Sequence, residues 1–378
     1  MYLASMMPAL LLSFLVISRT RPHWLAICLL SIILLISATW TYQRNITWQE
    51  PLAFWEDNLK KTPNDHRVLN NMGFSLMQAG HYDQAIPYLQ KSIQLKTSAQ
   101  TIRTTLLDPL RNLGAALIQI KKFDRAIETL QTAIKIDPES APSHVNLATA
   151  YEELEQHKKA ITHYKKALEI QPQSIRALTG LADIYLKQGT VQRAARYLQK
   201  AHAIDDKSVK IKTKLARCFV KTGQPEKAID LYQSALSIAP ANEALLINLG
   251  NTYAAKKNLS EAVKYYKKAL RLNPRNASAR FNLAVACSAQ KEYEKAIQIF
   301  REMLNYLPNN PNIYYNIACM HSLNGHPSKS AEWLKKALAK GYDSWKKIKT
   351  DPDLANLRQS KYYQELIATK KSQISNNK

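Results

Sequence analysis

Residues 243–276 read EALLINLGNTYAAKKNLSEAVKYYKKALRLNPRN, and the same pattern recurs every 34 residues from Leu107 to Ser344. A small residue returns at this spacing in two series. The first series is Gly114, Ala148, Ala182, Ala216, Gly250, Ala284 and Ala318. The second is Ala126, Ala160, Ala194, Ala228, Ala262 and Ala296, with Ser330 in the next place. A fixed period of this length indicates a repeat architecture instead of one globular core.

Each unit of the pattern predicts two helices. The small residues mark places where two helix backbones approach closely, and large side chains such as Tyr164 and Tyr266 fill the space beside them. Gly189 and Gly223 fall between the two helices, where a left-handed residue ends the first. A recurrent proline follows the second helix because proline cannot continue one. The chain is therefore expected to be all-α.

This period, the small-residue pattern and the closing proline resemble the tetratricopeptide repeat (TPR). The resemblance implies an α-solenoid of about eight repeats over residues 66–344, the first at 66–99. Residues 100–106 interrupt the period, and the sequence leaves open whether they extend a helix or form a loop. Residues 345–378 are expected to supply a capping helix and a basic tail, disordered from Ser372 onward.

Two apolar runs, Tyr2–Ile17 and Trp24–Trp40, precede the repeats. Each is close to the length that crosses a bilayer as a helix. A basic loop with Arg19 and Arg21 joins them. We therefore expect residues 1–43 to form an N-terminal transmembrane hairpin, with this loop in the cytoplasm and the repeats on the extracytoplasmic side of a cell (inner) membrane.

Residues 44–65 are expected to form a helix linking this anchor to the first repeat, because Trp48, Leu52 and Trp55 recur at helical spacing. Thr41, Arg44, Asn45 and Trp48, followed by Trp55-Glu56-Asp57, Pro63, Arg67 and Asn71, resemble a junction in protein O-mannosyltransferase-like membrane proteins. There the last membrane helices meet a TPR array. The resemblance implies that this chain is the C-terminal part of such a protein. The catalytic residues of that family lie upstream of the matching part, so none is assigned here.

The formal net charge of +24 favours acidic partners, anionic lipid head groups or polyanionic glycans, and a solvated lysine-rich helical exterior is the alternative explanation. Its basic residues are evenly spread and accompany no nucleic-acid-binding motif, so we expect no nucleic-acid partner. The four cysteines lack metal-ligand spacing and are expected to be buried small residues. Asp351-Pro352-Asp353 has the form of a glycosyltransferase metal motif, although a helix cap explains it better. We find no catalytic motif and expect neither a cofactor nor enzymatic activity.

An asparagine precedes the apolar–small pair in most repeats. These residues are Asn71, Asn112, Asn146, Asn248, Asn282 and Asn316, with Gly180 and Lys214 as exceptions. The TPR resemblance implies that this position faces the concave side of the array. Because an amide both donates and accepts hydrogen bonds, a row of asparagines suits the backbone of an extended peptide. Bonds within the array are the alternative. Phe281 and Tyr315 are predicted as further partner-binding residues in the groove.

The favoured function is a membrane-anchored protein–protein interaction module that binds polypeptide segments in its groove. The alternative is the substrate-recruiting part of a glycosyltransferase whose catalytic membrane half is absent from this chain. The expected partners are accordingly polypeptide segments, the lipid bilayer through residues 1–43, and a membrane glycosyltransferase.

Overall fold

The computed structural model describes residues 24, 28, 31–32, 34–39, 41–42, 50–95 and 102–376, with side chains from 105 to 368 in the last range. Most of the expected hairpin over residues 1–43 lies outside these described residues. Within them, no helix is both long and apolar enough to cross a membrane.

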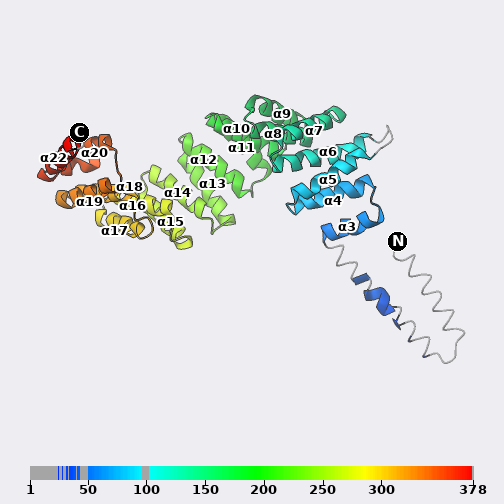
Figure 1. Ribbon diagram of the computed structural model, residues 1–378, viewed down its shortest axis with the longest axis horizontal. Coiled ribbons are helices and arrows are strands. Elements are labelled where there is room, and N and C mark those ends of the chain that lie inside the picture. The colour runs from blue at the N-terminus through cyan, green and yellow to red at the C-terminus, as the bar shows by residue number, and fades with distance from the viewer. Residues whose placement is uncertain are drawn as a thin grey trace. The chain divides into compact units, whose positions relative to one another are not determined.

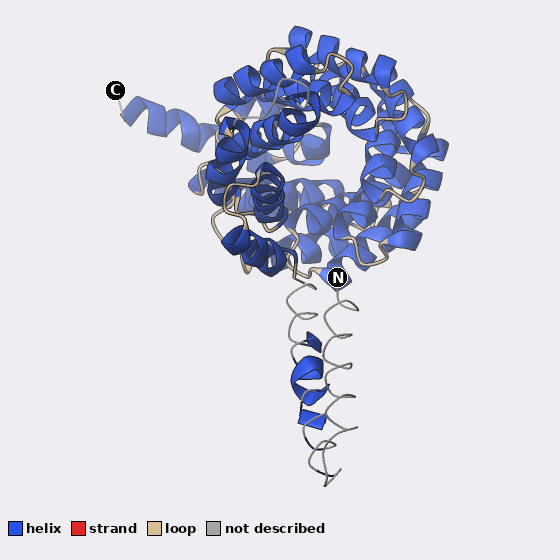
Figure 2. Cartoon of the chain, turned by 90° about the vertical axis from the view of Figure 1, so that its right-hand side faces the viewer, coloured by secondary structure: helices blue, strands red, loops and turns tan. Residues whose placement is uncertain are grey.

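The described residues fold into helices joined by short turns, with no strand among them (Figure 2). The expected all-α solenoid is therefore confirmed. Contacts divide the chain into two compact units, residues 1–172 and 173–378. Within each unit, helix pairs follow one another in chain order (Figure 1).

The first unit holds α3 and three helix pairs. Their bounds are α3 Pro51–Lys61, α4 His66–Gln78 with α5 Tyr82–Gln94, α6 Ile102–Gln119 with α7 Phe123–Ile136, and α8 Ala141–Glu153 with α9 His157–Ile170. Helix α3 packs against α4 and is shorter than the range 44–65 expected for a linking helix. Helix α6 begins at Ile102, so the last residues of the 100–106 interruption extend a helix. Residues 96–101 lie outside the described part.

The second unit holds five helix pairs and a cap. The pairs are α10 Ile175–Lys187 with α11 Val191–Ile204, α12 Val209–Lys221 with α13 Pro225–Ile238, α14 Glu243–Ala255 with α15 Leu259–Leu272, α16 Ala277–Ala289 with α17 Tyr293–Leu304, and α18 Pro311–Leu323 with α19 Pro327–Ala339. The cap consists of α20 Trp345–Thr350, a 3-10 turn Pro352–Leu354, α21 Ala355–Arg358 and α22 Lys361–Asn376.

The recurrent small residues are where the helices of a pair touch. In the α14–α15 pair, Leu249, Ala262 and Ala269 have no exposed surface, and Tyr266 is 2% exposed. A Cβ atom added at Gly250 would lie 2.6 Å from the Tyr266 ring, closer than real atoms approach. The pair is therefore as closely packed as the sequence pattern predicts.

The turn inside each pair requires a left-handed residue. Gly189 and Gly223 adopt φ of 74° there, as expected from the sequence. Where glycine is missing the backbone keeps the same conformation, since Lys257 has φ of 62° and Lys291 has φ of 64°. The solenoid geometry thus overrides the intrinsic preference of a lysine.

The cap closes the apolar end of the last pair. Ile348, Leu354 and Leu357 have no exposed surface and belong to the core cluster that contains α18 and α19. Asp351 accepts a hydrogen bond from the backbone N–H of Asp353, so Asp351-Pro352-Asp353 acts as a helix cap. Helix α22 continues to Asn376, whereas the sequence pattern indicated disorder from Ser372.

Candidate functional site

A groove of about 500 Å³ crosses the first helices of the last three pairs. It is lined by Ile247, Asn251, Ala277, Ser278, Phe281, Asn282, Met303, Leu307, Asn310, Asn312, Ile313 and Asn316. Most of these residues come from α14, α16 and α18. The lining combines asparagine amides with apolar side chains, so the groove offers both polar and apolar contacts.

Helical periodicity explains why these side chains face the groove. On α16, Leu283 and Ala284 are buried against neighbouring helices. Phe281 and Val285 lie one helical turn apart on another face of this helix, which points toward solvent. They are 38% and 46% exposed. Burial of one face of each first helix therefore presents the opposite face to the groove.

Asn282 and Asn251 form the polar centre of this groove. Asn282 Nδ2 donates to Asn251 Oδ1 over 2.9 Å. The hydroxyl of Tyr266 donates to the same Asn251 oxygen over 2.7 Å. Burial raises the pKa of Tyr266 to about 12, so the hydroxyl keeps the proton that it donates. Asn251 Oδ1 thus accepts two hydrogen bonds and holds both amide groups in place.

This arrangement leaves the side-chain NH2 group of Asn251 and the side-chain oxygen of Asn282 available in the groove lining. Among the described residues, no hydrogen bond uses Nδ2 of Asn251 or Oδ1 of Asn282. A peptide group requires such a donor for its C=O and such an acceptor for its N–H. The pair can therefore bind one peptide unit of an extended chain.

Two of the other three asparagine side chains in the groove lining hydrogen-bond within their own helix. Asn316 Nδ2 donates to the carbonyl oxygen of Asn312 over 2.8 Å, and Asn310 caps α18 by accepting from the backbone N–H of Asn312 over 3.0 Å. Beside them the Phe281 ring meets Phe300 edge to face, with centroids 5.8 Å apart. Ile247, Leu307 and Ile313 complete an apolar wall.

The structure brings only part of the predicted set together. Asn282, Asn316 and Phe281 share the groove. In the first unit, Asn112 donates to Asn70 over 3.0 Å, and Asn70 donates to Asn71 over 3.4 Å, which makes a smaller amide cluster.

Three predicted residues lie elsewhere. Asn146 is only 4% exposed, and Asn248 is half-buried and does not line the groove. Tyr315 is 2% exposed because it packs in the core, where its ring stacks on Tyr342 and its hydroxyl donates to Asp351 over 2.7 Å. It therefore offers no groove surface to a partner.

Asn251 is a central groove residue that the sequence pattern did not single out. It lies three residues after the asparagine series and 31 residues before Asn282. A comparison of positions 31 residues apart could have found it. At this spacing the asparagine position of one repeat contacts a residue on the first helix of the preceding repeat.

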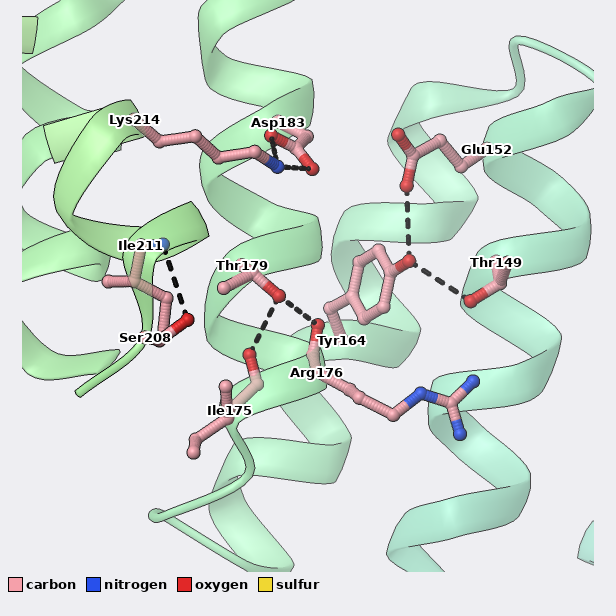
Figure 3. A network of polar contacts seen from close by, with 10 residues as sticks. All are labelled: Thr149, Glu152, Tyr164, Ile175, Arg176, Thr179, Asp183, Ser208, Ile211 and Lys214. Carbon is pink, nitrogen blue, oxygen red and sulfur yellow. Dashed lines mark hydrogen bonds and ion pairs between the residues drawn. The ribbon is translucent and has the colours of Figure 1, made fainter. Parts of the chain in front are cut away.

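The same relationship recurs with charged side chains. Lys214 Nζ lies 2.6 Å from both carboxylate oxygens of Asp183, again 31 residues away, and Figure 3 shows the lysine reaching from one helix to the next. The pair stands where Asn282 and Asn251 stand in a later repeat. The break in the asparagine series at Lys214 thus replaces an amide pair with an ion pair.

In the first unit, a tyrosine hydroxyl on α9 likewise contacts side chains of α8, the first helix of its pair. Tyr164 donates to the Glu152 carboxylate over 3.1 Å and lies 3.2 Å from the Thr149 hydroxyl (Figure 3). Tyr164 holds the place of Tyr266 in its own repeat, and Thr149 that of Asn251. A buried tyrosine is thus a recurrent support for these side chains.

The described residues contain no cluster of three or more groups that could hold a metal ion. Cys218 and Cys287 are buried, and burial raises the pKa of both thiols. Their neutral form is favoured, so neither resembles an activated nucleophile.

Comparison with known proteins identifies the repeat. A family model described as the cilia and flagella-associated protein 70 C-terminal domain matches residues 112–310, and a tetratricopeptide repeat model matches residues 65–139. The search of curated proteins gave no significant match.

Solved structures with similar helix arrays include MamA, YrrB and a protein from Parabacteroides merdae. MamA is 28% identical, with a TM-score of 0.41 over 44% of this chain and 96% of its own. YrrB, described as a TPR protein with an unusual peptide-binding site, is 22% identical, with a TM-score of 0.43 over 48% and 94%. A TPR protein from Parabacteroides merdae is 18% identical, with a TM-score of 0.46 over 72% and 98%.

Proposed function

Since the chain belongs to the tetratricopeptide-repeat family of the cilia and flagella-associated protein 70 C-terminal domain, we propose that its groove over α14, α16 and α18 binds an extended polypeptide segment. The chain is a TPR-type protein–protein interaction module. We place its peptide-binding surface in the groove that α14, α16 and α18 line.

The observation that carries the proposal is the Asn251–Asn282 pair. Nδ2 of Asn251 can donate to the C=O of a peptide unit, and Oδ1 of Asn282 can accept from its N–H. Such bonds hold any sequence, because they use the main chain of the partner. The exposed ring of Phe281 and the apolar wall beside it add a contact for one apolar side chain of that segment.

A peptide selection tests this proposal. Peptides selected from a random library on the wild-type protein are measured by fluorescence anisotropy against the variant Asn251→Ala/Asn282→Ala. Loss of two hydrogen bonds should weaken their binding roughly tenfold or more. The control is Asn305→Ala, which removes an exposed amide outside the groove lining. Equal binding by the double variant and the wild type would exclude the amide pair from recognition.

Membrane attachment remains part of the proposed function, on the strength of sequence alone. The apolar runs Tyr2–Ile17 and Trp24–Trp40 and the basic loop between them support a hairpin anchor with an extracytoplasmic array. Extraction of membranes with alkaline carbonate tests the anchor, and release of the chain into the soluble fraction would refute it. Protease protection in sealed vesicles tests on which side the repeats lie.

A second candidate function is recruitment of polypeptide substrates to a membrane glycosyltransferase. The resemblance of residues 41–71 to the junction in O-mannosyltransferase-like proteins favours it. The reading frame upstream of Met1 provides the test. An open frame rich in membrane helices would support a joined enzyme, whereas a stop codon would favour a separate module.

A further inference from the structure

Helix α12 carries a concentration of positive charge. Its sequence VKIKTKLARCFVK contains no acidic residue. Lys210, Lys214, Arg217 and Lys221 follow one another at intervals of four, three and four residues, so they lie along one face of the helix.

The matching face of the first helices lines the groove in the three following repeats. Lys214 corresponds to Asn282 and Arg217 corresponds to Asn251 in the 34-residue pattern. The Lys214–Asp183 pair reproduces the Asn282–Asn251 hydrogen bond, which supports the correspondence independently. Lys210, Lys214 and Arg217 therefore occupy groove positions of their own repeat, and Lys221 lies one helical turn beyond them on the same face.

Only one of these four cations is neutralised nearby. Lys214 pairs with Asp183, and both side chains are partly buried. Lys210, Arg217 and Lys221 are exposed, and none of them forms an ion pair with any residue that the structure describes. Three like charges on one helix face repel one another, so an anionic partner would stabilise this surface.

The corresponding positions in the three following repeats carry no charge at all. They are Ala244, Asn248, Asn251 and Ala255 on α14, Ser278, Asn282, Val285 and Ala289 on α16, and Asn312, Asn316, Cys319 and Leu323 on α18. A nucleic acid or another uniform polyanion would need cations along its whole path. Positive charge on α12, together with amides and Phe281 on the helices that follow, instead matches a polypeptide that has both an acidic and a neutral stretch.

We propose that the segment bound by this chain has an acidic run that lies over α12, next to a neutral stretch whose apolar side chain contacts Phe281. This inference rests on the proposed peptide-binding function and names the chemistry of the partner. The acidic run supplies charge complementarity, and the neutral stretch uses the Asn251–Asn282 pair.

Defined probes test the inference. One labelled peptide joins a run of aspartates to a neutral segment containing leucine and phenylalanine, and a second replaces the aspartates by asparagines. Both have blocked termini, so that only side-chain carboxylates differ. The first should bind the full chain about tenfold more tightly, and added salt should reduce the difference.

Matched charge variants locate the effect. Lys210→Glu/Arg217→Glu/Lys221→Glu should remove the preference for the acidic probe, and the same positions changed to Gln should reduce it. The control is Lys200→Glu/Lys267→Glu/Arg271→Glu, which changes the net charge equally on exposed positions of second helices. Circular dichroism establishes that each variant keeps its helices.

Several results would overturn the inference. One is equal loss of binding in the α12 and control variants, which would indicate a general charge effect. Another is tighter binding of oligo-dT or heparin than of the acidic peptide to wild type, lost in the α12 variant, which would make α12 a site for uniform polyanions. If both probes bind equally and depend on Asn251 and Asn282, the inference fails while the proposed function stands. If neither probe binds and the library selects no peptide, both fail.

Discussion

Lys214 Nζ lies 2.6 Å from both carboxylate oxygens of Asp183, in the same place in the repeat where Asn282 Nδ2 lies 2.9 Å from Asn251 Oδ1. Each pair joins a residue of one first helix to the first helix before it, 31 residues earlier. The position thus couples neighbouring repeats in two chemical forms, one ionic and one neutral. The ionic form belongs to the basic part of the second unit and the neutral form to the amide groove.

The first prediction is that these two forms are interchangeable for folding. The double variant Asp183→Asn/Lys214→Asn should keep the free energy of unfolding within about 1 kcal/mol of wild type, because an amide pair replaces a partly exposed ion pair. Lys214→Ala alone should cost about 1 kcal/mol, since it leaves the Asp183 carboxylate without its cation. Urea denaturation of Asp183→Asn, Lys214→Asn and the double variant measures the coupling between the two side chains.

The outcome that would contradict this prediction is additivity. If the losses of Asp183→Asn and Lys214→Asn simply sum in the double variant, the two side chains do not interact in solution. Urea denaturation of Asn251→Ala, Asn282→Ala and their double variant then shows whether the neutral pair has a similar coupling free energy.

The second prediction concerns the support beneath the groove. Tyr266→Phe removes the hydroxyl that donates to Asn251 but keeps the buried ring. The variant should lose about 1 kcal/mol of unfolding free energy and should bind selected peptides more weakly, because Asn251 is no longer held in one orientation. Tyr265→Phe is the control, since its half-buried ring stacks on Tyr253 and lies outside this groove. Equal peptide affinity in the two variants would argue against a positioning role for Tyr266.

The features that the sequence predicted well are those set by steric rules. Close approach of two helices permits only small residues at positions such as Gly250 and Ala262, and a left-handed turn favours glycine at Gly189. These requirements recur in every repeat and therefore appear as a period. The helix pairs and the all-α solenoid follow from that period alone.

The groove was harder to predict because it depends on neighbours that differ between repeats. Asn282 and Asn146 occupy the same position in the pattern, yet one is half-buried in the groove and the other is 4% exposed. Tyr315 follows the position rule of Phe281 but is covered by the cap, since Tyr342 and Asp351 take up its ring and hydroxyl. The period shows which face a residue points to, but not what lies against it.

The third prediction concerns strain in the turns. Lys257 adopts φ of 62° at the place where Gly223 adopts 74° in the preceding repeat. A left-handed backbone costs a residue with a side chain about 1–2 kcal/mol, and the greater freedom of glycine in the unfolded chain offsets part of this gain. Lys257→Gly should therefore raise the free energy of unfolding by about 0.5 kcal/mol, measured by urea denaturation.

The reverse change provides the internal control. Gly189→Lys should lower the free energy of unfolding by a similar or somewhat larger amount, because it introduces the strain that Lys257 carries. Stabilisation by Gly189→Lys, or destabilisation by Lys257→Gly, would mean that other contacts of the turn outweigh the backbone term.

The fourth prediction is a loss of stability in mild acid caused by a histidine pair. His144 Nε2 lies 3.0 Å from the carbonyl oxygen of Pro138, so this nitrogen carries a proton, and His144 Nδ1 accepts from His163 Nδ1 over 3.0 Å. Burial, together with the nearby His144, lowers the pKa of His163 below its usual value of 6.5. The folded protein therefore holds this imidazole neutral at a pH where the unfolded chain binds a proton.

The sign of the effect follows from proton linkage. Above pH 6.5 both states keep His163 neutral, and its contribution to stability is fully present. Below pH 6.5 the unfolded state takes up more protons, so the contribution is lost as the pH falls toward the lowered pKa of the folded state. Urea midpoints at pH 7.5 and 5.5 should differ less for His163→Gln than for wild type. His81→Gln, at an exposed histidine, should leave the difference unchanged. If His163→Gln keeps the full acid sensitivity, other groups cause it.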